Sequence, residues 1–100
     1  MTLKKWPDHD PDAVLDYGRL WGDWLNGDTI ATSDWIIQAD TDDLNPVSEL
    51  AKSHTGTTTT LWLQGGTPGK RYTIVNHIIT NSSPIPRQND RSITLKCKEL

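Results

Sequence analysis

The segment Leu61-Trp-Leu-Gln-Gly-Gly-Thr-Pro-Gly-Lys-Arg-Tyr-Thr-Ile-Val-Asn76 decides the fold of this chain. Two runs of β-favouring residues stand in it on either side of a short stretch rich in glycine and proline. This order suits two strands that belong to different sheets of a sandwich, because the chain must turn sharply to pass from one layer to the other. We therefore expect residues 65–69 to form a corner.

Tyr72 opens the second of these runs. A tyrosine just past such a corner can bury its ring and bond its hydroxyl to nearby backbone, as in the tyrosine corner of immunoglobulin-like and fibronectin-like domains. We expect Tyr72 to be a structural corner residue whose hydroxyl bonds to backbone between Gly65 and Lys70. Gly66 and Lys70 stand where the fibronectin pattern has leucine and threonine, so the strand topology stays open at this point.

The rest of the chain reads as further strands separated by turn signals. Apolar residues recur at helical spacing before residue 26, but Gly18 and Gly22 each cost a helix about 1 kcal/mol relative to alanine. We expect a short helical turn near residues 20–25, which Gly27 closes in the left-handed conformation. Strands are predicted at residues 14–18, 29–38, 47–52, 57–63, 71–80 and 90–98. This pattern predicts one all-β, immunoglobulin-like or fibronectin-like sandwich over residues 14–100.

Residues 1–13 contain two prolines and three aspartates, with little to bury beyond Trp6. Ordering this segment costs roughly 1–2 kcal/mol of backbone entropy per residue, which so little apolar surface does not offset. We expect an extended N-terminal arm that is mobile or held only through Trp6 and its prolines. Deleting residues 1–9 is then expected to spare the fold.

Composition narrows the possible partners. The 100 residues carry 10 basic and 13 acidic side chains, a formal charge of −3, without the positive field that nucleic-acid binding requires. No apolar run approaches the roughly 20 residues that cross a membrane, and no secretion signal opens the sequence, so we expect synthesis in a cytoplasm. Cys97, the single cysteine, alternates with polar residues and is expected to be a small buried hydrophobe.

The sequence offers no convincing catalytic, metal or cofactor site. The aspartates at 8, 10 and 12 and at 40, 42 and 43 begin like calcium loops but lack the closing glycine and glutamate. The histidines at 9, 54 and 77 share no metal-ligand spacing. His77 could join a hydrolase triad in space, but any sequence rich in Ser, Thr and Asp offers such combinations. We expect no enzyme activity, no metal and no cofactor.

The tryptophans are the remaining candidates for binding. Trp62 points away from Leu61 and Leu63 and so covers either the outer sheet face or a partner surface, where tryptophan is enriched in hot spots. Trp6 on the arm is either an anchor for a partner or packs on its own domain. With Trp24, these residues are the candidate partner-binding side chains. Trp35 is expected in the core.

Several segments together resemble a known family of small structural proteins of tailed bacteriophages, the fiber-tail adaptors. The resemblance covers about residues 5–98, and the combined pattern is more specific than any one segment. The segments that carry it are Asp10–Tyr17, Trp21–Leu25, Gly27–Ile30 with Trp35, Thr57–Gly66, Tyr72–Ile78 and Asp90–Ile93.

The resemblance implies a noncatalytic virion component that joins the tail or neck to fibers or other virion proteins. Its implied partners are other phage proteins, with a homo-oligomer possible in the particle, and its implied location is the virion. Three alternatives stay open: a carbohydrate-binding module that stacks sugars on Trp24 and Trp62, a head-decoration protein, and a small hydrolase using His77. The exposure of these three side chains separates the first and third from the adaptor.

Overall fold

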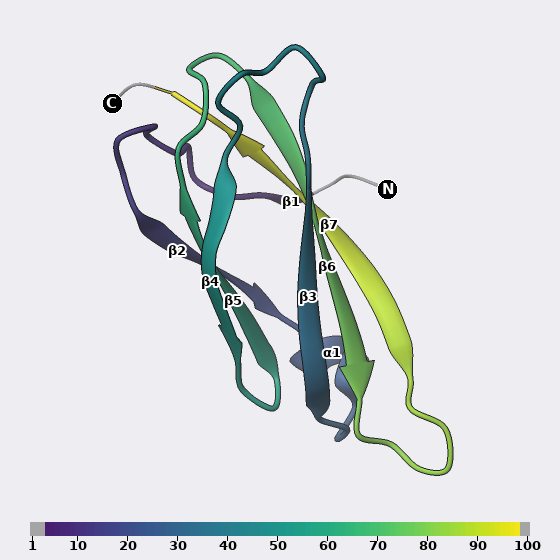
Figure 1. The fold of residues 1–100 in the computed structure, drawn as a ribbon. Helices are drawn as coiled ribbons and strands as arrows, with labels where there is room; N and C mark the ends of the chain where they lie inside the picture. The colour runs from purple at the N-terminus through teal and green to yellow at the C-terminus, as the bar shows by residue number, and fades with distance from the viewer. Residues whose placement is uncertain (1–3, 99–100) are drawn as a thin grey trace.

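A computed structural model describes residues 4–98 as two packed β-sheets (Figure 1). One sheet has the strand order β1-β7-β6-β3 and the other the order β2-β5-β4. Neighbouring strands are antiparallel except β1 and β7, which run parallel. The elements are β1 (Lys4–Lys5), β2 (Leu15–Leu20), α1 (Gly22–Leu25), β3 (Ile30–Gln38), β4 (Ser48–His54), β5 (Thr58–Gln64), β6 (Arg71–Thr80) and β7 (Gln88–Lys96).

The strand order is that of an immunoglobulin-like domain. In that fold the second, fourth and fifth strands share one sheet, and the third, sixth and seventh share the other, as they do here. The first strand lies beside β7 rather than in the sheet of β2. The predicted all-β sandwich is therefore confirmed, and the order of the strands in the two sheets gives the topology that the corner pattern left open.

The helical turn that the sequence predicted is α1, a single turn of four residues. The left-handed conformation that ends it is shared by Asn26 (φ 49°) and Gly27 (φ 91°), whereas the sequence pointed to Gly27 alone. Trp21, immediately before α1, is completely buried, and Leu25 is buried beside it. The turn thus closes one end of the sandwich.

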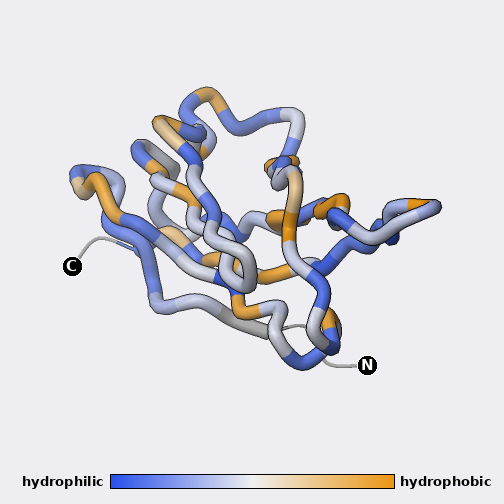
Figure 2. The backbone as a smooth tube through the Cα atoms, turned by 90° about the horizontal axis from the view of Figure 1, so that it is seen from below, coloured by the Kyte–Doolittle hydropathy of each residue, from blue (hydrophilic) through white to orange (hydrophobic). Residues whose placement is uncertain are grey.

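Alternation along the strands builds the core. In β5, Thr59, Leu61 and Leu63 face inward while Trp62 faces outward, as the sequence predicted. Figure 2 shows the same change between hydrophobic and hydrophilic residues along the chain. Cys97 is completely buried, as predicted, and its burial raises the pKa of the thiol.

The core consists of two clusters. The larger lies under the corner, and Trp35 packs against its edge; its buried members are Trp6, Tyr17, Val47, Leu61, Leu63, Tyr72, Ile74, Ile93, Leu95 and Cys97. The smaller gathers around α1 and contains Trp21, Leu25, Ile30 and Ile78. Asn76, also completely buried, lies on β6 between Ile74 and Ile78, which belong to different clusters.

Asn76 uses its whole side-chain amide. Its oxygen accepts hydrogen bonds from Trp21 Nε1 (2.8 Å) and Thr59 Oγ1 (2.6 Å). Its nitrogen donates to Ser33 Oγ (3.0 Å) and to the backbone oxygen of Asp34 (3.1 Å). These are the two acceptor and two donor positions that an amide has, so the group is fully satisfied although no water reaches it. The bonds join β6, β3, β5 and the start of α1.

The corner is built as the sequence predicted, with one addition. Tyr72 is 1% exposed, and its hydroxyl accepts a 3.0 Å hydrogen bond from the backbone N–H of Thr67. The same hydroxyl donates to Asp43 Oδ2 at 2.6 Å, a contact from the β3–β4 loop that the local sequence does not reveal. The hydroxyls of Thr67 and Tyr72 both donate to Asp43 and lower the pKa of its carboxyl.

Replacing Tyr72 with phenylalanine should lower stability without changing the fold. The lost bond to Thr67 is worth about 0.5–1.5 kcal/mol, and losing the bond to the Asp43 carboxylate adds to the effect. Urea denaturation of the parent and the Tyr72→Phe variant at neutral pH measures the difference. Equal midpoints would show that the hydroxyl does not stabilise the corner.

The expectation of a loosely held arm is wrong for the part of it that the structure describes; residues 1–3 lie outside the described range. The backbone N–H of Trp6 donates to Thr94 (3.0 Å), and His9 exchanges bonds with Lys96 (2.9 Å) and Lys98 (2.8 Å). These bonds and the buried indole of Trp6 together offset the ordering entropy that the sequence argument counted against the segment. Deleting residues 1–9 would remove a core side chain, contrary to the prediction.

His9 also lies in the interior. It is completely buried, and its Nδ1 is 2.9 Å from the hydroxyl of Tyr17. Burial lowers the pKa of His9 below its usual 6.5 and raises the pKa of Tyr17 to about 12. Because the folded state disfavours protonated His9, its stabilising contribution is present above pH 6.5 and is lost as the pH falls through the lowered pKa.

Candidate partner-binding surfaces

His77 has a carboxylate partner but no hydroxyl nucleophile among its hydrogen-bond contacts. It lies on the outer face of the four-stranded sheet, where its Nδ1 contacts the carboxylate of Asp90 and its Nε2 is 3.2 Å from Gln88 Oε1. These contacts lead to a carboxylate and an amide rather than to a hydroxyl nucleophile, so they do not form a triad. Among residues 4–98, no three His, Cys, Asp or Glu side chains gather as metal ligands would.

Within residues 4–98, no helix is long and apolar enough to span a membrane. The helix α1 is a single turn of four residues.

Trp6 is not exposed to a partner. Its ring stacks on Tyr17 at 4.8 Å between centroids, and its Nε1 donates to the backbone oxygen of Gly18 at 3.1 Å. Only 9% of its surface is accessible. The second of the two interpretations drawn from the sequence, packing on its own domain, describes the structure.

Trp24 is half-buried, and its ring already contacts other side chains of the protein. The guanidinium of Arg87 lies 4.1 Å above the ring centroid, and Trp21 packs against it edge-on at 5.6 Å. Arg87 also donates to the backbone oxygens of Trp24 and Leu25 and so holds α1 in place. The carbohydrate-binding alternative requires Trp24 and Trp62 to present open ring faces together. The ring of Trp24 instead packs against Trp21 and Arg87.

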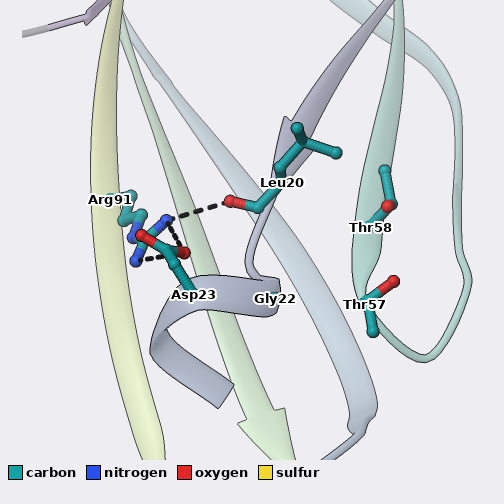
Figure 3. A pocket seen from close by; sticks show the side chains of 6 residues that line it. All are labelled: Leu20, Gly22, Asp23, Thr57, Thr58 and Arg91. Carbon is teal, nitrogen blue, oxygen red and sulfur yellow. Dashed lines mark hydrogen bonds and ion pairs between the residues drawn. The ribbon is translucent and has the colours of Figure 1, made fainter. Parts of the chain in front are cut away.

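A shallow pocket of about 360 Å³ lies beside α1 (Figure 3). Arg91 reaches across it and donates to the backbone oxygen of Leu20 (2.9 Å) and to Asp23 Oδ1. Its guanidinium also covers the ring of Trp21 at 4.3 Å. The arginine is thus tied to the protein's own groups. The remaining lining comes from Gly22, Thr57 and Thr58.

The two edges of the three-stranded sheet differ. Along β2, the backbone oxygens of Gly18 and Leu20 accept hydrogen bonds from Trp6 and Arg91, which belong to the opposite layer. That edge is therefore capped by side chains. At the other edge, β4 pairs with β5 on one side and with no other strand among the described residues, and all seven of its residues are exposed. β4 is therefore the open edge of this sheet.

Trp62 lies next to this open edge. It is 38% exposed on the outer face of β5, opposite Asp16 of β2 and Ala51 of β4. A β-bulge in β4 between Glu49 and Ala51 places the half-exposed Leu50 nearby. We call Trp62, Leu50, Ala51 and the free edge of β4 the Trp62 surface.

A cleft of about 470 Å³ separates β4 from β3, the edge strand of the other sheet. Lys52 spans it and binds Asp34 Oδ1 at 2.7 Å. This is an exposed pair, so it contributes little to stability. The pair nevertheless links the edge strands β3 and β4 of the two sheets.

The sequence singled out three tryptophans, and the structure leaves only Trp62 on an open surface. Sequence reasoning predicted a strand at residues 47–52 but not its place at a sheet edge, although its polar composition with a single large aliphatic residue, Leu50, was a signal for an exposed strand. In residues 40–46 it noted only the incomplete calcium-loop pattern of the aspartates at 40, 42 and 43. In that loop Leu44 is 99% exposed between polar neighbours.

One comparison with known proteins identifies relatives of this chain. The family described as podophage GP4 fiber-tail adaptor protein gp77 matches residues 9–96. A comparison with curated proteins gave no match.

Proposed function

This chain belongs to the podophage GP4 fiber-tail adaptor family, and from that premise we propose that it joins the phage tail to fibers through noncatalytic protein–protein contacts. Membership makes it a structural protein of the virion that interacts with other tail proteins. The match covers residues 9–96, which include α1 and the strands β2 to β7 but not β1. The connecting role is the function that the surfaces described above support best.

The observation that carries this proposal is the Trp62 surface. The ring of Trp62 is partly exposed beside β4, and the outer backbone groups of β4 have no partner strand within residues 4–98. Tryptophan is among the residues most enriched in binding hot spots, and a free edge strand accepts an extended segment from another chain. We propose that a segment of a virion partner pairs with β4 and packs on Trp62.

The same edge also limits indiscriminate pairing. Glu49 and Lys52 place charges on β4, and the bulge near Leu50 interrupts its regular ladder. A partner must therefore match both the bulge and the charges. This combination suits a protein that must remain unpaired before assembly and bind one neighbour afterwards.

Replacing Trp62 with alanine should reduce binding to the virion at least about tenfold, as expected for the loss of a hot-spot side chain. The assay adds purified protein to phage particles assembled without it and measures the bound copies by quantitative mass spectrometry. The control is Ile36→Ala, because Ile36 is 56% exposed on the outer face of the opposite sheet. Both variants should melt close to the parent.

Two results would contradict the proposal. If the parent protein itself fails to bind such particles, the connecting role is wrong. If the parent binds and Trp62→Ala binds equally well, the partner does not use the Trp62 surface.

A further inference from the structure

Trp21 and Arg91 show how this protein covers an indole ring. The guanidinium of Arg91 lies 4.3 Å from the ring centroid of Trp21. It also donates to Asp23 Oδ1, at 3.3 Å from Nη1 and 3.2 Å from Nη2 (Figure 3). A guanidinium is attracted to the face of an aromatic ring and presents a fork of donors to a carboxylate. One arginine therefore binds the ring and the aspartate together.

Trp24 repeats this arrangement with a second arginine. The guanidinium of Arg87 lies 4.1 Å from the ring centroid of Trp24, and its Nη1 forms an ion pair with Asp28 Oδ2 at 3.7 Å. Each of these two tryptophans is thus grouped with one arginine and one aspartate of the same chain.

Trp62 has an aspartate beside it but no arginine over its ring. Asp16 of β2 stands directly opposite Trp62 of β5 in the antiparallel register. Residues paired in this way share a sheet face, with their Cβ atoms about 4.5–5.5 Å apart. Both side chains are exposed. Within residues 4–98, no guanidinium lies over the Trp62 ring and Asp16 forms no ion pair.

Asp16 also brings the charge to this face of the three-stranded sheet. Glu49 and Lys52 of β4 stand opposite buried residues of β5 and therefore belong to the inner face. The other strand residues that the register places on the face of Trp62 are uncharged: Gly18, Leu20, Ser48, Ala51, Ser53, Thr58, Thr60 and Gln64. The carboxylate beside the Trp62 ring thus has no counter-charge among the strand residues of its own face.

We infer that the partner segment at β4 supplies an arginine whose guanidinium lies over the Trp62 ring and binds the carboxylate of Asp16. The inference rests on the connecting role and the Trp62 surface proposed above, and it names the side chain that this surface recognises. Charge complementarity and the two arginine–tryptophan–aspartate groups within this chain support it. Arginine fits better than lysine, because a planar guanidinium stacks on an aromatic ring while its N–H groups bind a carboxylate.

The spacing of the strands allows this contact. A segment paired with β4 lies two strand spacings, roughly 10 Å, from β5. Ala51 stands between them, directly opposite Trp62. Its methyl group is too small to block a long side chain that extends from the partner segment toward the indole. The inferred arginine therefore crosses β4 at Ala51.

Replacing Asp16 with asparagine should weaken binding to phage particles assembled without the protein by about three- to tenfold, because the guanidinium loses its carboxylate partner. The melting temperature should stay that of the parent. The charge-matched control is Asp12→Asn, since Asp12 is exposed in the connection before β2. The control should bind like the parent. Equal losses in the two variants would mean that net charge alone matters, and no loss in Asp16→Asn would overturn the inference.

A double-mutant cycle tests whether Trp62 and Asp16 contact the same group. In a protein that already carries Trp62→Ala, Asp16→Asn should have a smaller effect than it has in the parent, because both substitutions act on one guanidinium. Losses that simply add would contradict a shared arginine.

The identity of the partner side chain has a direct test. Gln64 is exposed on the same face as Trp62, so a Gln64→p-benzoylphenylalanine variant keeps the ring and cross-links the adjacent partner segment on irradiation. Mass spectrometry of the linked peptide should identify a segment with an arginine whose replacement by lysine weakens binding of the parent. A segment without such an arginine would overturn the inference.

The failures of the two proposals are distinguishable. A parent protein that fails to bind the particles refutes the connecting role. A binding parent that is sensitive to Trp62→Ala but not to Asp16→Asn refutes only the inferred arginine.

Discussion

Replacing Asn76 with leucine should lower the free energy of unfolding by about 3–5 kcal/mol. The leucine is of similar size, but it leaves two buried donors and two acceptors without their present partner, and each unsatisfied buried group costs roughly 1–3 kcal/mol. The groups affected are Trp21 Nε1, Thr59 Oγ1, Ser33 Oγ and the oxygen of Asp34. At about 4–8 °C per kcal/mol for a domain of this size, the melting temperature should fall by more than about 10 °C.

A second asparagine provides the comparison. Asn81 follows β6 directly, is exposed, and donates one side-chain bond to Thr29 Oγ1 at 2.9 Å. Asn81→Leu should cost less than about 1 kcal/mol, because water replaces the lost bond. Urea denaturation of both variants measures the difference. Similar losses for the two would mean that the buried network around Asn76 does not stabilise the packing between the sheets.

Replacing Gly66 with alanine should cost about 2–5 kcal/mol. The residue is buried at φ +110°, and an added Cβ would lie 2.7 Å from Cys97 Sγ and 2.8 Å from Val47 Cγ1. The left-handed conformation costs an L-residue roughly 1–2 kcal/mol, and inserting atoms into a packed core costs about 1–3 kcal/mol more. Thermal and urea denaturation measure the sum.

Gly69 separates the two effects. It also has a positive φ (+88°), but an added Cβ there meets no atom within 4 Å. Gly69→Ala should therefore show the backbone cost alone and lose about 1–2 kcal/mol. In addition, Cys97→Ala should recover part of the loss in Gly66→Ala, because it removes the sulfur that the Cβ contacts. No recovery, together with equal losses at the two glycines, would show that the close approach to Cys97 is unimportant.

The candidate sites were less accessible to sequence reasoning than the fold. Trp62 was recognised because period-two alternation with Leu61 and Leu63 sets its direction without knowledge of the partner strands. Trp6 and Trp24 could not be placed in this way, since their exposure depends on Tyr17 and Arg87, which are distant in sequence.

The all-β sandwich, the corner at residues 65–69 and the inward direction of Tyr72 could be predicted from the sequence. These features depend on local physics: alternation along a strand, the turn chemistry of glycine and proline, and the position of one tyrosine after a corner. Three features depend on the tertiary structure instead: the docking of residues 4–9 on β7, the position of β4 at a sheet edge, and the role of Asn76. Each of these depends on hydrogen bonds between residues far apart in the chain, such as Asn76 and Trp21, and no local pattern specifies which distant group will complete a buried polar pair.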